Sequence, residues 1–230
     1  MVPSTASGTA SSTAPGTASG TGRTWAGSTL DARRDARRAR LLAVGLELLG
    51  GPEGAAAVTV RSVCRHAKLT DRYFYESFAD RDELLLAVYD EVAEQAQSAL
   101  VEAVSSTPPD TSDAVARAAV RAFLGLLTDD PRKGRVLLLA PMSDPLLSQH
   151  ALRLQLAFGE LIRLQLATVD GGREPAPVEQ RLTASALIGA LTQLFIRWLD
   201  GSLEVSPAEL ADYCVRLLLT SVPLARPRTS

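Results

Sequence analysis

Two short helical patterns joined by a tight turn, in residues 59–78 (TVRSVCRHAKLTDRYFYESF), constrain the fold of this chain more than any other stretch. Thr59 can cap the first helix and Thr70 the second, which leaves only residues 67–69 to join them. Two short helices with such a turn are typical of the helix-turn-helix, whose second helix lies in the major groove of DNA. The stretch therefore predicts an element that reads double-stranded DNA.

The second helix concentrates aromatic side chains in a chain that contains only 5% of them. Phe74 and Phe78 are spaced i, i+4, so both are expected to pack, together with Leu69, against the first helix of the domain. The polar residues between them are then left to face solvent or a ligand.

Positive charge gathers in the same part of the chain. Residues 23–78 carry ten basic and six acidic side chains, a net charge of +4, whereas the whole chain has a net charge of −2. A basic segment on an acidic remainder indicates a polyanionic partner for that segment alone. The arginine-rich run 33–40 reads as a solvated helix face that can also touch flanking phosphates.

Arg72 is the strongest candidate for a contact with a base. An arginine can form a bidentate pair with guanine, which is the commonest specific base contact. The alternative is a solvated arginine paired with Asp71 or Glu76.

Helical periodicity continues through the rest of the chain, and no sustained period-two strand occurs. Asp80 and Glu83 form a capping box for a long helix, and Ser206 with Glu209 marks the start of the last one. We therefore predict an all-α fold of about nine helices. The expected divisions are a disordered Ser/Thr/Ala/Gly-rich tail at 1–30, a helix-turn-helix domain at 31–78, a helical effector-binding and dimerisation domain at 79–222, and a disordered tail at 223–230.

We expect a cytoplasmic location, because the sequence shows neither a secretory signal nor a membrane-spanning stretch. The first thirty residues have no apolar region after a basic start, as a secretory signal requires. No stretch approaches the roughly 18 apolar residues that span a bilayer, so no membrane partner is predicted.

Metal and catalytic sites find little support in the sequence. Cys64 and His66 form a C-x-H pair without a second pair to complete four zinc ligands, so no metal or other cofactor is expected. The acidic pair at residues 129–130 is better explained by a turn that ends a helix. His66 and His150 have no nearby sequence partner for acid–base work, and no nucleotide-binding or hydrolase motif occurs. An enzyme is therefore not predicted.

Residues 59–67, 69–70, 74–75 and 78, with Arg81 and Leu84, resemble the TetR family of bacterial transcriptional regulators. The shared pattern is a Thr-led helix, a small residue before the turn, a polar cap, an aromatic pair and a basic residue that opens the fourth helix. The resemblance covers about residues 35–90. It implies a three-helix DNA-binding domain followed by a helical domain that binds a small ligand and dimerises.

The sequence departs from the family pattern in three ways, at four positions. Lys68 replaces the usual glycine of the turn, at a cost of about 1 kcal/mol if φ is positive there, which phosphate attraction can offset. Arg72 and Tyr73 replace smaller residues, which predicts a different operator. Ser77 is shorter than its counterparts, which weakens the case for a phosphate contact there.

The resemblance implies a set of DNA contacts. Tyr75 is expected to send its hydroxyl to a phosphate, and Arg61 to reach bases or backbone. Thr59 and Arg81 lie at helix N-termini, where a backbone amide and a side chain can hold one phosphate together. The full predicted set is Thr59, Arg61, Thr70, Asp71, Arg72, Tyr73, Tyr75, Ser77 and Arg81.

The resemblance also implies roles for the C-terminal helices. Two apolar stripes fit a two-fold four-helix interface, with an intramolecular core as the alternative. The predicted interface residues are Leu187, Leu191, Leu194, Phe195, Trp198, Leu210, Tyr213 and Leu217. The aromatic, flexible or polar residues on otherwise apolar helices are candidates for a pocket. These are Phe123, Met142, His150, Phe158, Gln193 and Arg197.

Together these features predict a homodimeric, ligand-responsive repressor of a palindromic operator, released by a small hydrophobic effector. The alternative is a helical small-molecule-binding or scaffold protein without sequence-specific DNA binding.

Overall fold

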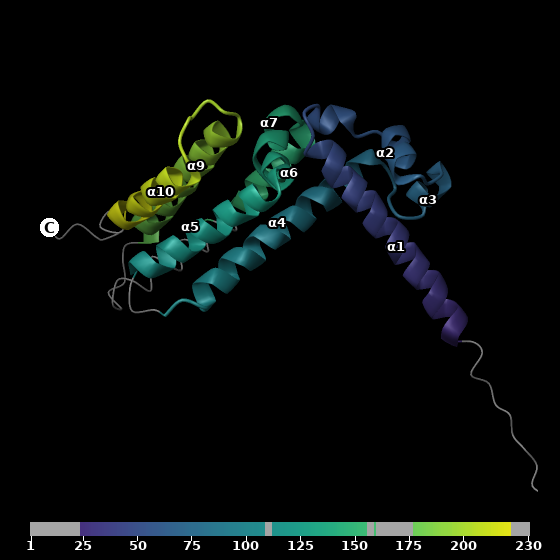
Figure 1. Ribbon diagram of the computed structural model, residues 1–230, viewed down its shortest axis with the longest axis horizontal. Coiled ribbons are helices and arrows are strands. Elements are labelled where there is room, and N and C mark those ends of the chain that lie inside the picture. The colour runs from purple at the N-terminus through teal and green to yellow at the C-terminus, as the bar shows by residue number, and fades with distance from the viewer. Residues whose placement is uncertain (1–23, 109–111, 156–158, 160–176, 222–230) are drawn as a thin grey trace, which may run out of the picture. The chain divides into compact units, whose positions relative to one another are not determined.

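The computed structural model describes residues 24–108, 112–155, 159 and 177–221, and every regular element in these ranges is helical (Figure 1). Residues 145–155 are helical as well. The all-α prediction is therefore confirmed. The elements are α1 (Thr24–Leu49), η1 (Gly54–Ala57), α2 (Val60–Ala67), α3 (Asp71–Tyr75), α4 (Arg81–Ser105), α5 (Ser112–Asp129), α6 (Pro131–Gly134), the π-helical η2 (Arg135–Leu139), α7 (Ala140–Ser143), α9 (Pro177–Leu199) and α10 (Pro207–Ser221).

The chain divides into two compact units after Ala36, and every contact described below lies within the unit that begins at Arg37. Helix α1 begins at Thr24, within the segment that was expected to be a tail. Once a helix is nucleated, each further residue adds a backbone hydrogen bond, so an alanine- and arginine-rich helix readily extends past the first apolar residue of its pattern.

One apolar core joins the helix-turn-helix to the helices that follow it. Its fully buried side chains include Leu41 of α1, Val63 of α2, Phe74 of α3 and Leu84 of α4. A Cβ added at Gly45 of α1 would come within 2.7 Å of the α4 residue Val88, so α1 and α4 cross in close contact at this glycine. The same core continues into η2, α7 and the helical residues 145–155, so it is not interrupted at the predicted boundary after residue 78.

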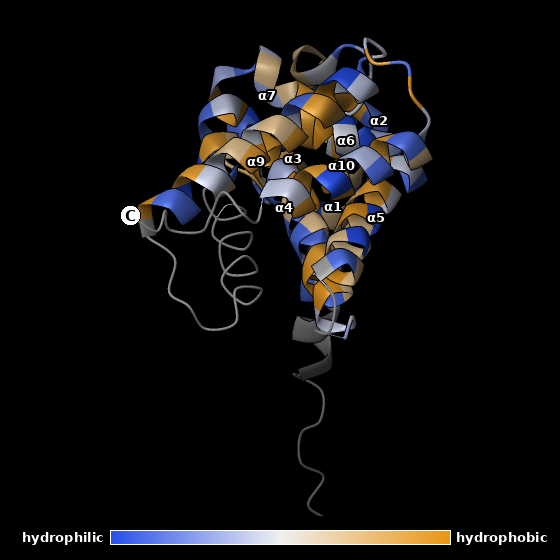
Figure 2. Cartoon of the chain, turned by 90° about the vertical axis from the view of Figure 1, so that its left-hand side faces the viewer, coloured by the Kyte–Doolittle hydropathy of each residue, from blue (hydrophilic) through white to orange (hydrophobic). Residues whose placement is uncertain are grey.

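A second apolar cluster joins α5, α9 and α10. Leu127, Phe195 and Leu210 are buried in it, and Cys214 is completely buried. Helix α5 lies alongside both α4 and α10 (Figure 1). The long helices α4 and α5 carry both apolar and polar residues along their length, as amphipathic helices do (Figure 2).

The helix boundaries follow the capping residues at three of the four predicted N-caps. Thr59 and Ser62 form a reciprocal capping box, the Asp80 carboxylate accepts a hydrogen bond from the Glu83 amide at 2.8 Å, and Ser206 caps α10. Thr70 occupies the N-cap position of α3, but its side chain makes no capping hydrogen bond. That part of the prediction is wrong: Thr70 is exposed, and only its carbonyl engages α3.

Helix α9 is more apolar than the sequence reading allowed. Residues Val178–Leu199 have a mean hydropathy of 1.4 over a length that could cross a membrane, and 28% of this apolar window is buried. The expectation that no stretch approaches such a length was therefore wrong. Length and composition alone do not distinguish a membrane helix from one that packs in a soluble protein, and Leu187 and Phe195 are buried within the chain.

Candidate nucleic-acid interface

Helix α3 packs one face against the core and exposes the other, as the recognition helix of a helix-turn-helix does. Phe74 is 0% exposed and Phe78 is 1% exposed, which confirms their predicted core role. Arg72, Tyr73 and Tyr75 are exposed on the same short helix. The Tyr75 ring packs edge-to-face on Phe74, with 5.5 Å between ring centroids, so its base is supported while 59% of the residue stays exposed.

The start of α2 holds two of the predicted contact residues. Arg61 is exposed in the first turn. The Thr59 hydroxyl accepts a hydrogen bond from the Ser62 amide at 3.0 Å and donates one to the Ser62 hydroxyl at 3.1 Å. The capping box therefore uses the Thr59 side chain within the protein, while the residue itself remains exposed.

The turn between α2 and α3 depends on a left-handed lysine. Lys68 has φ 54° and ψ 42°, the left-handed conformation that favours glycine. The positive φ considered for this position in the sequence is therefore present. The Leu69 amide donates to the Cys64 carbonyl at 3.0 Å, which closes the helix end. Lys68 and Arg65 are both exposed here, and Arg65 was not among the predicted contacts.

Cys64 and Asp71 connect the two helices of the motif. Burial raises the pKa of the Cys64 thiol to about 11, and a hydrogen bond and the negative charge of Asp71 add to this shift. The raised pKa favours the protonated thiol, which can donate a hydrogen bond to the Asp71 carboxylate.

Arg72 is held by an acidic residue of its own helix end. Its Nε donates to the Glu76 Oε1 at 3.1 Å, although the Arg72 side chain is 85% exposed. The other Glu76 oxygen lies 3.4 Å from Nη2 of Arg37 on α1. The Arg37 guanidinium also lies over the Tyr73 ring, 4.6 Å from its centroid. This ion pair is the one named as the alternative to a base contact, and the outer end of Arg72 remains exposed.

Arg38 takes a structural role beside the same helix end. It donates to the Ser77 carbonyl at 2.9 Å and lies 4.3 Å from the centroid of the Phe78 ring. Ser77 itself is half-buried, and its hydroxyl oxygen is buried without a hydrogen-bond partner. Part of the arginine-rich run thus fastens α3 to α1, and the Ser77 hydroxyl faces the protein interior.

Arg81 is half-buried at the first position of α4 and is engaged within the protein. Its Nε donates to the Val58 carbonyl at 2.7 Å, and its Nη2 donates to the Ala55 carbonyl at 2.8 Å. It also pairs with the carboxylates of Asp82 at 2.8 Å and Asp144 at 3.5 Å. These contacts link the segment before α2 with the residue after α7. A guanidinium bonded in this way is poorly placed to serve as a phosphate contact.

The predicted pocket residues do not gather around one cavity. Phe123 packs on Phe195, Met142 is 67% exposed, and His150 is hydrogen-bonded to Asp90. Gln193 and Arg197 are exposed on α9. Phe158 lies outside the described residues.

The predicted dimer residues divide between core and surface. Leu187, Phe195 and Leu210 are buried within the chain, and Leu191, Leu194 and Trp198 pack against the second apolar cluster. This arrangement favours the alternative considered for the stripes, an intramolecular core. Leu217 is half-buried, and Tyr213 is 51% exposed.

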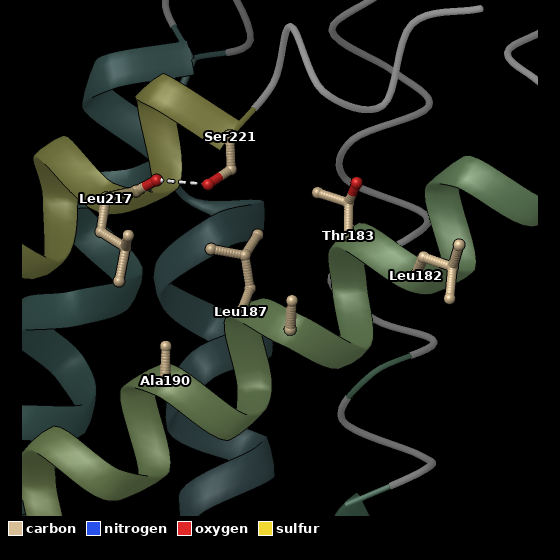
Figure 3. Close-up of a pocket in the computed structure, with 7 residues that line it drawn as sticks. Leu182, Thr183, Leu187, Ala190, Leu217 and Ser221 are labelled. Carbon is tan, nitrogen blue, oxygen red and sulfur yellow. Dashed lines mark hydrogen bonds between the residues drawn. The ribbon is translucent and has the colours of Figure 1, made fainter.

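An apolar groove of about 350 Å³ lies between α9 and α10 (Figure 3). Leu182, Leu187 and Ala190 of α9 face Leu217 and Ser221 of α10 across it, and the Ser221 hydroxyl donates to the Leu217 carbonyl at 2.8 Å. The sequence reading did not predict a pocket here because it chose aromatic, flexible and polar residues for the pocket, whereas leucine and alanine side chains line most of this groove.

Asp130 and the two histidines considered for catalysis make hydrogen bonds within the protein. Asp130 caps α6 and forms a two-point ion pair with Arg132, whose hydrogen bonds lower the pKa of the Asp130 carboxyl. His66 is exposed and bonded to the Ser62 carbonyl. In the part of the chain that the structure describes, no group of three or more His, Cys, Asp or Glu side chains could hold a metal ion.

No protein-family model matches the sequence, and no curated protein matches it either. Solved structures do match. A TetR-like transcriptional regulator from Rhodococcus sp. RHA1 is 20% identical, with 81% of this chain and 96% of that chain covered and a TM-score of 0.64. This chain has the fold of TetR-family transcriptional regulators.

Two further structures with the TetR-family fold are similar to this chain. The fatty acid degradation regulator FadR from Bacillus halodurans is 14% identical, with 80% of this chain and 94% of that chain covered and a TM-score of 0.67. The transcriptional regulator FadR from Bacillus subtilis, in complex with stearoyl-CoA, is 16% identical, with coverages of 79% and 97% and a TM-score of 0.66. The resemblance inferred from residues 59–84 is confirmed at the level of the fold.

Proposed function

We propose that this protein is a ligand-responsive transcriptional regulator that binds a palindromic operator as a homodimer. The observation that carries the proposal is the division of α3, which buries Phe74 completely and exposes Arg72, Tyr73 and Tyr75. A short helix with that division, behind a three-residue turn, can present polar side chains to base edges while remaining fixed to its domain. The net positive charge of residues 23–78 supplies attraction to phosphates.

The DNA contacts are assigned from the exposed polar residues around α3. Arg72 reads a base, and Tyr73 and Tyr75 contact bases or phosphates. Four further exposed residues are assigned to the edge of the DNA major groove: Thr59, Arg61, Thr70 and Asp71. The sequence also suggested Arg81 and Ser77. Neither is assigned a DNA contact, because Arg81 is bonded within the protein and the Ser77 hydroxyl is buried.

A homodimer is supported by the surface of α9 and α10. Leu182, which lines the groove between these helices, is 65% exposed, and Tyr213 of α10 is 51% exposed. Burying such apolar surface against a second copy removes it from water, and two helices from each copy would form a four-helix interface. Burial in such a dimer would also account for the apolar character of α9 without a membrane. The protein is accordingly proposed to be cytoplasmic.

The effector is proposed to be a small hydrophobic molecule. The Bacillus subtilis FadR structure holds stearoyl-CoA, and long acyl chains suit apolar helical bundles. Effector binding would favour a dimer geometry whose reading helices no longer match the half-site spacing. Operator affinity then falls by the difference between the effector's affinities for the two geometries, which gives repression that the effector relieves.

Selection of binding sites from random duplex DNA at physiological salt tests the proposal. A two-fold symmetric motif is expected, and Arg72→Ala and Tyr75→Ala should weaken binding to it. Arg153→Ala removes one exposed positive charge outside the helix-turn-helix and serves as the control. Weak binding without an enriched motif would refute the DNA-reading function.

Sedimentation tests the dimer, and an acyl ligand tests the response. Leu182→Glu should lower the dimer fraction, whereas Leu152→Glu, at a residue that is 60% exposed elsewhere, should not. Stearoyl-CoA should release the selected operator at concentrations where CoA alone does not. A monomer that binds a symmetric site with full affinity would contradict the dimer.

A further inference from the structure

The side chain of Arg72 is anchored at one end and exposed at the other. Its Nε is bonded to the Glu76 Oε1, while the side chain as a whole is 85% exposed. The two Nη groups at the tip of a guanidinium can together donate to the O6 and N7 acceptors of guanine. An arginine held through Nε therefore keeps its bidentate end available.

The anchor is itself fixed by a second arginine from another helix. The Glu76 Oε2 lies 3.4 Å from the Arg37 Nη2, and the Arg37 guanidinium is stacked over the Tyr73 ring. Glu76 is 34% exposed and Arg37 is 26% exposed, so both are more sheltered than Arg72. The contacts run from α1, through Glu76, to the outer face of α3.

The second arginine changes what the acidic residue does. A single exposed i, i+4 ion pair contributes little and holds a long side chain poorly. With Glu76 already bound to Arg37, Arg72 meets a fixed acceptor and loses less rotamer freedom when it engages DNA. The three side chains together carry a net charge of +1, so Glu76 does not cancel the attraction of this surface for phosphates.

We propose that Glu76, held by Arg37, is a positioning residue that orients Arg72 to read one guanine in each operator half-site. This inference rests on the proposed function, because it presupposes that α3 enters the major groove. Neither Glu76 nor Arg37 needs to touch the DNA. Specificity at that base pair is set partly by residues that make no base contact.

The test is a base-by-base specificity profile from random-DNA selection, measured for the full-length wild type and for Arg72→Ala, Glu76→Gln and Arg37→Gln. Arg72→Ala identifies the base pair at which discrimination is lost. Glu76→Gln and Arg37→Gln should lower discrimination at that same base pair by roughly 5-fold or more and leave the other positions unchanged. Arg153→Gln is the control, since it removes one exposed positive charge outside the helix-turn-helix. Its profile should match that of the wild type.

Each outcome separates this inference from the proposed function. A wild type that selects no symmetric motif overturns both. A wild-type motif with an unchanged Glu76→Gln profile overturns the positioning role alone. A uniform loss at every base pair, or a loss accompanied by a lower melting temperature, assigns Glu76 a structural role and also overturns it. If Glu76→Gln does not fold, Arg37→Gln decides the question by the same criterion.

Discussion

Replacing Lys68 by glycine should make the protein more stable, although it removes a charged residue from the centre of the motif. Lys68 has φ 54°, a left-handed conformation that costs an L-residue about 1–2 kcal/mol. Glycine avoids this cost but loses about 0.5–1 kcal/mol through the greater freedom of its unfolded chain. The difference predicts a gain of roughly 0.5–1 kcal/mol for Lys68→Gly, or about 1–4 °C in melting temperature for a chain of this size.

The assay is urea unfolding followed by circular dichroism, at one fixed protein concentration because a dimer's stability depends on concentration. Lys68→Ala is the matched control, since it removes the same charge but keeps a Cβ in the left-handed conformation. It should be no more stable than the wild type. Equal free energies of unfolding for the glycine and alanine variants would refute the argument that the turn stores conformational strain.

Three further outcomes are expected. Arg81→Gln should lower the free energy of unfolding by about 2–3 kcal/mol, because two charge-assisted bonds to carbonyls are lost. The salt dependence of operator binding should stay unchanged, and a slope reduced by about 1 would instead indicate a phosphate contact. Thr59→Ala should cost about 0.5–2 kcal/mol in thermal or urea unfolding by removing the cap of α2, whereas Thr59→Ser should cost less. Burial raises the pKa of the Cys64 and Cys214 thiols from 9.0 to about 11, so the folded state favours their protonated forms. Their contribution to the free energy of unfolding is present below about pH 9 and is lost as the pH rises toward 11. A variant with both cysteines replaced by alanine should therefore lose less stability between about pH 9 and 11 in urea unfolding. An equal loss in the variant and the wild type would contradict the raised pKa values.

Short-range chemistry accounts for the parts of the fold that could be predicted. The α2 and α10 caps, and the burial of Phe74 and Phe78, depend on residues three or four positions apart, whose spacing is visible in the sequence. The same locality explains why the helix-turn-helix could be recognised.

The site details that could not be predicted depend on residues far apart in the chain. Arg37 and Glu76 are separated by 39 positions, and Arg81 and Asp144 by 63. No periodicity or motif encodes such pairs. The sequence therefore suggested a DNA contact for Arg81 from its position at a helix N-terminus. In the structure, its hydrogen-bond acceptors belong to segments that are distant in the chain and pack against it.

The bonds of Arg81 have a consequence for how this protein tolerates sequence change. Two of its acceptors are main-chain carbonyls at positions 55 and 58, which every amino acid supplies. Side chains at those positions can therefore drift over generations without deleting an acceptor. The ion pair with Asp144, by contrast, is lost whenever position 144 loses its carboxylate. Among related sequences, positions 81 and 144 should therefore change together, while positions 55 and 58 vary under packing constraints alone.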